Sequence, residues 1–133
     1  MNVTKRQLEL FHNNAHLLLS QKKGQESKLL FKLRKVIKKT TNLFNDYMDE
    51  IQEIRIDHAS VDEKGNVIQV EGNYKFTPEK VKELTKKIRA KEKELIEIEP
   101  HFVDNMPEDL PLDFREVFEN FVLREQEEPS EKE

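Results

Sequence analysis

Two histidines, His12 and His16, stand four residues apart in the first predicted helix. At that spacing two imidazoles lie on one helical face and can bind the same metal ion. A zinc site needs further ligands, and no third ligand follows at a suitable spacing. The chain has no cysteine, which excludes thiolate ligands and disulfides. We therefore expect a structural or solvent-facing role for both histidines, with no metal and no cofactor.

The segment DEKGN, residues 62–66, resembles the start of a calcium-binding loop. With Asp62 as the first ligand, however, Lys64 takes the third position and Val67 the position that requires glycine. The segment therefore predicts a turn. The chain also lacks a phosphate-binding glycine loop and a nucleophile elbow, and its carboxylates have no apolar surroundings that would tune them for acid–base work. We predict that the protein is not an enzyme.

The segment KLLFKLRKVIKK, residues 28–39, concentrates positive charge on one predicted helix. Because such a helix can follow a phosphate backbone, a nucleic-acid-binding accessory factor is one candidate function. Against it stand the net charge of -4 and the lack of aromatic or amide side chains arranged for base contacts. A solvated or internally paired surface is the alternative. The candidate nucleic-acid patch consists of Lys28, Lys32, Lys35, Lys38 and Lys39.

The composition favours long helices with one apolar stripe each over a deep globular core. Of the 133 residues, 35% are hydrophobic and 38% are charged, which leaves little apolar surface to bury. No signal-peptide pattern is present, and no segment approaches the ~20 apolar residues of a membrane span. We therefore expect a protein made in the cytoplasm that does not enter a membrane. Residues 1–124 form one predicted helical domain, and residues 125–133 form a predicted disordered acidic tail.

Apolar residues at spacings of three and four predict four helices. The predicted ranges are 4–20, 25–57, 77–98 and 112–124. The third start is the clearest, because Thr77 suits an N-cap and Pro78 suits the first helical position. The predicted fold is mainly α: an antiparallel helical hairpin with a small β-hairpin tip and short N- and C-terminal helices.

The order of charges in the two long helices supports an antiparallel arrangement. The second helix is basic first and then acidic, and the third helix repeats this order. Folded back on each other, the two helices bring opposite charges together at both ends. The pattern predicts that Glu50 lies near Lys86, Asp46 near Arg89, and Lys39 near Glu97.

Residues 59–76 form a β-like segment between the two long helices. Gly65 and Gly72 suit turns with positive φ, and three short strands are predicted at 59–61, 67–70 and 74–76. Ordinary helix–helix connections need only ~2 to 8 residues. This longer tip also carries more apolar side chains than a turn requires, so either it is a contact site or it is a self-contained cap. The predicted contact residues are Val67, Ile68, Val70, Tyr74 and Phe76.

The remaining apolar side chains predict a core at the open end of the hairpin. Phenylalanines from the first, second and last helices would build it: Phe11, Phe31, Phe114, Phe118 and Phe121. The second helix has more apolar positions than the shorter third helix can cover, so we expect self-association or a protein partner. A non-enzymatic protein–protein interaction protein is therefore the first functional hypothesis.

The order of these elements resembles a family of small proteins of unknown function from tailed bacteriophages. The similarity rests on ESKLLFKLRKVIKK, on DEIQEIRIDHASVDEKGN and on KELTKKIRAKEKELIEIE, within residues 5–124. It implies a phage structural or assembly-associated factor in the cytoplasm of the bacterial host or in the virion, with phage structural proteins among its partners. The helical hairpin with a β tip also resembles prefoldin in shape, which gives a coiled-coil chaperone as a further alternative. The additional terminal helices depart from the prefoldin plan.

Overall fold

The computed structural model describes residues 1–124. Its elements follow the order β1 (Asn2–Thr4), α1 (Lys5–Gln21), α2 (Lys28–His58), β2 (Gln69–Val70), β3 (Asn73–Tyr74), α3 (Pro78–Glu92), β4 (Leu95–Glu97) and α4 (Leu112–Phe118). The prediction of a mainly α protein with a small antiparallel β element is confirmed. The predicted tail, residues 125–133, lies outside the described residues.

Side-chain caps determine where the first two helices begin. The Thr4 hydroxyl accepts a hydrogen bond from the Gln7 amide, and the Gln7 side chain accepts one from the Thr4 amide, which completes a capping box. Ser27 caps α2 by accepting from the Leu30 amide. Gly24 has a φ of +85° in the connection between these helices. Glycine adopts this left-handed conformation without steric cost, which allows a tight connection between α1 and α2.

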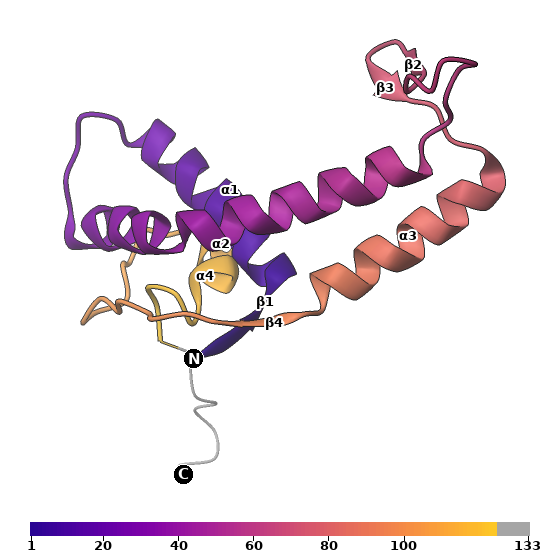
Figure 1. Ribbon diagram of the computed structural model, residues 1–133. Helices are drawn as coiled ribbons and strands as arrows, with labels where there is room; N and C mark the ends of the chain where they lie inside the picture. Colours follow the sequence, from indigo (N-terminus) through magenta and orange to yellow (C-terminus); the bar gives the residue numbers. More distant parts are fainter. Residues whose placement is uncertain (125–133) are drawn as a thin grey trace.

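Helix α3 runs back beside α2, and the segment containing β2 and β3 lies at the end of this pair remote from α4 (Figure 1). Thr77 caps α3 by accepting from the Lys80 amide, and Pro78 is the first helical residue, as predicted. We call α2 from Asp46 onward, together with residues 59–93, the arm, and the rest of the described chain the body. The hydrophobic core cluster contains no buried residue between Val36 and Ile98.

The prediction that the third helix continues to about residue 98 is wrong. Helix α3 ends at Glu92, and β4 pairs with β1 in an antiparallel register that places Val3 opposite Ile96. The Lys5 amide donates to the Glu94 carbonyl at 2.9 Å and extends this pairing. Ile96 and Ile98 alternate with Glu97 and Glu99, which is the period of a strand with one buried face. Because β1 supplies backbone partners, this segment is stable as a strand rather than as a helix.

The last helix is also shorter than predicted, because α4 ends at Phe118 instead of continuing to residue 124. Glu119 is extended, with a ψ of 139°, and Asn120 has a φ of +72°. The Phe118 carbonyl then accepts from the amides of residues 121–123. The resulting turn lets Phe121 and Val122 accept hydrogen bonds from the His101 and Val103 amides, each at 2.9 Å. Bonding to the connecting loop therefore replaces the last predicted helical turns.

Four of the five predicted core phenylalanines are buried in the body. Phe11 stacks on Phe121 with ring centroids 4.3 Å apart, and it meets Phe118 edge to face at 5.8 Å. Phe114 stacks on Phe118 at 5.6 Å. The prediction for Phe31 is wrong, since its side chain is 54% exposed. Its neighbour Leu30 points into the core, and at 100° per residue Phe31 falls outside the inward face set by Leu30, Leu33 and Val36.

The tip is a small set of paired backbone segments rather than a regular sheet. Strands β2 and β3 pair over two residues each, and Val61 forms an isolated bridge with Val67. Glu71 and Gly72 join the strands with φ values of +53° and +82°, the backbone sign expected at both central positions of a type I′ turn. Gly65 has a φ of +86° in the other turn, so both glycines occupy the predicted left-handed positions.

Candidate interaction surfaces

The predicted contact residues of the tip lie together at the end of the arm, but they differ in exposure. Val67, Ile68, Tyr74 and Phe76 are half-buried, whereas Val70 is 54% exposed. The Gln52 amide donates to the Tyr74 hydroxyl at 2.6 Å, and the Tyr74 and Phe76 rings meet edge to face at 6.5 Å. One part of the tip therefore leans on α2 and is partly covered by the chain itself.

Val61 was not among the predicted contact residues, although it is as exposed as Val70 at 54%. Its bridge to Val67 places it on the first of the three predicted tip segments. Backbone bonds link the three segments in turn: the Ile68 amide donates to Ser60 at 2.9 Å, and the Lys75 amide donates to Ile68 at 3.0 Å. Val61 and Val70 are thus the two exposed apolar side chains of the tip. The sequence signal that pointed to Val61 was its place in the first predicted strand, 59–61.

The basic segment places four lysines on one face of α2. Lys28, Lys32, Lys35 and Lys39 recur at spacings of four, three and four residues, while Lys38 lies to one side of that face. Lys39 Nζ lies 2.9 Å from a Glu99 oxygen, and this contact lowers the pKa of Glu99. The other four lysines of the patch form no ion pair within residues 1–124. The structure therefore brings most of the predicted patch together and neutralises one member.

His101 lies beside this lysine face. Burial, followed by repulsion from Lys35 and Lys39, lowers the pKa of its imidazole. His101 Nε2 lies 3.1 Å from a Glu99 oxygen, although the geometry does not satisfy a hydrogen bond. Burial is the larger cause of this shift, and the nearby lysines add to it. Sequence spacing alone did not connect His101 with these lysines.

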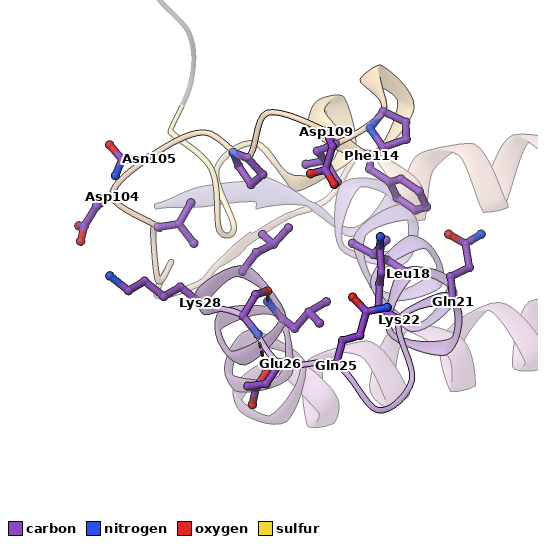
Figure 2. A pocket seen from close by; sticks show the side chains of 17 residues that line it. Leu18, Gln21, Lys22, Gln25, Glu26, Lys28, Asp104, Asn105, Asp109 and Phe114 are labelled. Carbon is purple, nitrogen blue, oxygen red and sulfur yellow. Dashed lines mark hydrogen bonds between the residues drawn. The ribbon is translucent and has the colours of Figure 1, made fainter.

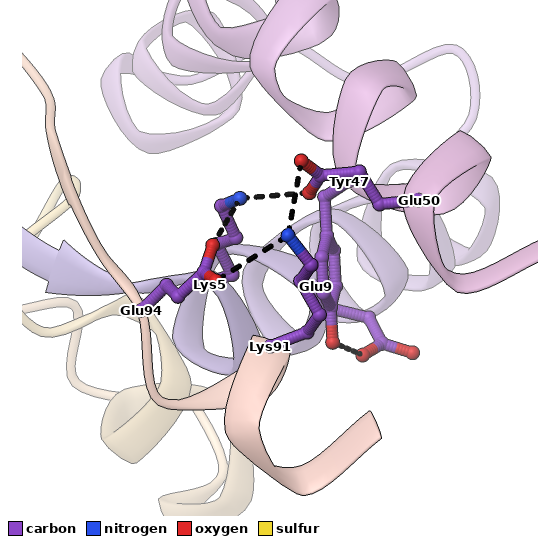
Figure 3. A network of polar contacts seen from close by, with 6 residues as sticks. All are labelled: Lys5, Glu9, Tyr47, Glu50, Lys91 and Glu94. Atoms are coloured by element: carbon purple, nitrogen blue, oxygen red, sulfur yellow. Dashed lines mark hydrogen bonds and ion pairs between the residues drawn. The ribbon is translucent and has the colours of Figure 1, made fainter. Parts of the chain in front are cut away.

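A network of four charged side chains joins the base of the arm to the body (Figure 3). Lys5 Nζ lies 2.7 Å from carboxylate oxygens of both Glu50 and Glu94. Burial alone would lower the pKa of Lys5, but the hydrogen bonds to the two glutamates outweigh it, so the pKa is raised. Lys91 joins the network at 3.5 Å from Glu50 and 3.3 Å from Glu94.

These ion pairs correct the predicted register of the two long helices. Glu50 lies near Lys91 rather than Lys86, and Lys39 pairs with Glu99 rather than Glu97. Asp46 and Arg89, the third predicted pair, form no ion pair with each other. Lys5 of α1 contacts both Glu50 of α2 and Glu94, which lies just past the end of α3. This shared contact places Glu94 close to Glu50, in a register that differs from the predicted one. Opposite charges still meet, but with α3 displaced along α2.

Tyr47 of α2 makes a further polar contact with α1 near this charged network. Its hydroxyl donates to a Glu9 oxygen at 3.1 Å, and Arg6 lies 2.9 Å from that same oxygen. Burial and the neighbouring Glu9 charge raise the pKa of Tyr47. A phenol with a raised pKa stays protonated and keeps donating to the carboxylate. The arrangement therefore fixes α1 against α2.

The histidine pair is divided between core and surface. His12 is buried, its Nε2 atom lies 2.8 Å from the Thr40 hydroxyl, and its ring stacks on Phe44 at 4.4 Å. Burial, with a contribution from His16, lowers the pKa of His12 to about 4. His16 is exposed. Within residues 1–124, no group of three or more histidine, aspartate or glutamate side chains is placed to hold a metal ion.

A cavity of about 460 Å³ lies between the α1–α2 connection and the loop that precedes α4 (Figure 2). Its apolar surface includes Leu18, Leu29 and Leu110, and Phe114 reaches it from α4. The rim combines cations and acids, with Lys22 and Lys28 on one side and Asp104 and Asp109 on the other. Because the two signs of charge are mixed, the rim favours no single class of ligand.

Comparison with protein-family models, curated proteins and solved structures finds no match for this chain. Among the helices of residues 1–124, none combines the length and the apolar character required to cross a membrane. The contacts of the chain itself are therefore the basis for inferring its function.

Proposed function

We propose that the protein is a non-enzymatic protein–protein interaction protein in which α2 and α3 form an antiparallel helical hairpin that engages its partner. The main observation that supports this proposal is that α3, a helix of 15 residues, contains no buried residue. Helices of this length in water normally depend on the burial of an apolar face. In α3, Leu84 and Ile88 are only half-buried, and Val81 is 44% exposed.

The tip extends this argument to the end of the arm. Exposed Val61 and Val70 lie on neighbouring backbone segments, remote from the core cluster of the body. Apolar side chains grouped in this way are a common feature of protein-binding surfaces. We infer that the tip contributes to the contact, with self-association as the first case to test. A phage structural or assembly-associated role is the biological setting that the family resemblance adds to this proposal.

The absence of cysteine permits a direct test with single labelling sites. The full chain carrying Val70→Cys is labelled with a donor or an acceptor dye, and energy transfer is measured from one to several hundred micromolar. The matched control is Leu112→Cys, which places the dye on a 65% exposed residue of the body. We expect transfer that rises with concentration at residue 70 and is weaker at residue 112. No transfer at either position would contradict self-association, and equal transfer would contradict the role of the arm.

Nucleic-acid binding is the second candidate function, supported by the lysine face of α2. Binding through this face should weaken steeply between 50 and 200 mM salt, because each neutralised phosphate releases counterions. Fluorescence anisotropy with labelled duplex and single-stranded DNA measures this dependence. Lys32→Glu with Lys35→Glu should abolish binding, whereas Lys64→Glu with Lys75→Glu, which reverses the same number of charges on the tip, should not. Absence of binding at 50 mM salt would remove the candidate.

A further inference from the structure

The outer face of α3 carries a stripe of four cations. Lys82, Lys86, Arg89 and Lys93 recur at spacings of four, three and four residues, which places them on one helical face. All four are exposed, and none forms an ion pair within residues 1–124. With Val81, Thr85 and Ala90 they line an open groove of about 620 Å³. We call these four residues the basic stripe.

The neighbouring helix carries a matching stripe of acids. Asp46, Asp49, Glu53 and Asp57 recur at spacings of three, four and four residues on one face of α2. These four are also exposed and form no ion pair within the described chain, in contrast to Glu50 between them. We call them the acidic stripe. At 1.5 Å per residue, each stripe is roughly 16 Å long.

The two stripes are not placed to neutralise each other within one chain. The side of α3 that faces α2 is marked by half-buried Leu84 and Ile88 and by Lys91, which contacts Glu50. At 100° per residue, the basic stripe falls on the opposite side of α3. Each stripe therefore keeps four like charges at helical spacing, an arrangement that is unfavourable in isolation.

We propose that a second copy of this chain docks on the arm, with the acidic stripe of each copy against the basic stripe of the other. This inference rests on the proposed function and specifies both the partner and the surface. The two stripes have the same number of charges, opposite sign and nearly equal length. Reciprocal pairing about a twofold axis would use both stripes of both copies and would leave no stripe open. Val81 and Ala90 supply apolar area at the same groove.

Charge pairing at exposed positions is weakened by salt, which makes the contact measurable. The full chain is examined by sedimentation velocity at 50 and 500 mM NaCl. We expect a dimer at low salt whose dissociation constant increases at least tenfold at high salt. The basic stripe is reversed by Lys86→Glu with Arg89→Glu, and the acidic stripe by Asp49→Lys with Glu53→Lys. Each double variant alone should be monomeric, since the altered stripe then has no net charge and its two central positions carry the same sign as the stripe that they would face.

Mixing the two double variants gives the decisive result. In an equimolar mixture, the unchanged stripes pair with each other and the reversed stripes also pair, so a dimer should form again. Lys22→Glu with Lys23→Glu, on the α1–α2 connection, is the matched control and should dimerise like the unaltered chain. Circular dichroism melting verifies that every variant is folded.

Three outcomes would overturn the inference. If the unaltered chain assembles but neither reversal weakens assembly, the stripe pairing is wrong while the proposed function stands. If the unaltered chain is monomeric at both salt concentrations and the labelled arms show no transfer, both proposals fail. If the basic-stripe reversal abolishes DNA binding and leaves the oligomeric state unchanged, the basic stripe is a nucleic-acid surface instead.

Discussion

His12 Nε2 lies 2.8 Å from the hydroxyl oxygen of Thr40, between α1 and α2. The Thr40 hydroxyl donates its hydrogen to the Val36 carbonyl at 2.7 Å. It can therefore only accept from the imidazole, so the proton of the neutral ring is on Nε2. Both residues are buried, with exposed fractions of 2% and 3%. A single polar contact thus fixes both the tautomer of His12 and the packing of these two helices.

Replacing Thr40 by valine tests this contact. Thr40→Val removes the acceptor and leaves a buried N–H without a partner, which costs roughly 1–3 kcal/mol of the free energy of unfolding. Urea unfolding followed by circular dichroism at pH 7 measures the change. Thr41→Val is the control, because Thr41 makes the same type of bond to a helix carbonyl, at 2.6 Å, but holds no histidine. Equal losses in the two variants would mean that the His12 bond contributes nothing.

Acidification should destabilise the protein through His12. The pKa of this imidazole is about 4 in the folded chain, against 6.5 as its ordinary value. Between these values the unfolded chain binds a proton that the folded chain does not, so stability falls as the pH falls from 6.5 toward 4. From pH 7 to pH 5 the loss due to His12 is about 2 kcal/mol.

The variant His12→Gln isolates this contribution, because glutamine can donate to Thr40 without titrating. Urea unfolding at pH 7 and pH 5 should show a smaller loss for the variant than for the unaltered chain. Glu94 and Glu99, whose pKa values are lowered by Lys5 and Lys39, contribute equally to both proteins and cancel in the comparison. An identical pH dependence in the two proteins would rule out His12 as the source.

Lys5 should contribute more to the free energy of unfolding than the other lysines that form long-range ion pairs. Lys5→Met removes the ammonium between Glu50 and Glu94, and its side chain is only 14% exposed. We expect a loss of about 1–2 kcal/mol in the free energy of unfolding, since hydrogen bonds to charged groups are lost and Lys91 replaces them only in part. Lys39→Met removes an exposed partner of Glu99 and should leave the unfolding midpoint nearly unchanged. A Lys39 effect as large as that of Lys5 would contradict the special position of Lys5.

The pairing of β1 with β4 should make a measurable contribution through Val3. Val3 is 1% exposed and belongs to the core cluster, so Val3→Ala should cost roughly 1–3 kcal/mol of the free energy of unfolding. Leu95→Ala on β4 is the control, because Leu95 is 65% exposed and its truncation should cost less than about 0.5 kcal/mol. Thermal melting of both variants gives the comparison. If Val3→Ala melts like the unaltered chain, the β1–β4 pairing is not part of the stable fold.

Local signals allowed the helix starts and the turns to be predicted from the sequence. Thr77 with Pro78, and the two glycines of the tip, Gly65 and Gly72, act through their own backbone and side-chain preferences, which do not depend on distant residues. The strand β4 was missed because its stability depends on β1, at the other end of the described chain. The Lys- and Glu-rich composition typical of a helix also continues through residues 93–98. For that reason the alternation of Ile96 and Ile98 with acidic residues was not interpreted as a strand.

The candidate surfaces were predicted less completely than the fold. The lysine face and the apolar tip follow from spacing, whereas the exposure of Val61 and the partial burial of four tip residues depend on how the tip packs on α2. The pairing of His12 with Thr40 requires the packing of two helices, which spacing within one helix cannot give. The predicted register of the long helices was wrong for a similar reason, since Lys5, which contacts Glu50, belongs to a third element.

The strand pair β1–β4 determines when the protein can fold during its synthesis. Residues 2–4 leave the ribosome well before their hydrogen-bond partners at 95–97, which are made only after the whole of the intervening chain. Phe11 of α1 likewise cannot pack until Phe118 and Phe121 have been made. Closing so long a loop carries an entropic cost, and contacts distant in sequence slow folding. Helix α1 therefore keeps its apolar face exposed until residues 95–121 have been made, and only then can the body assemble.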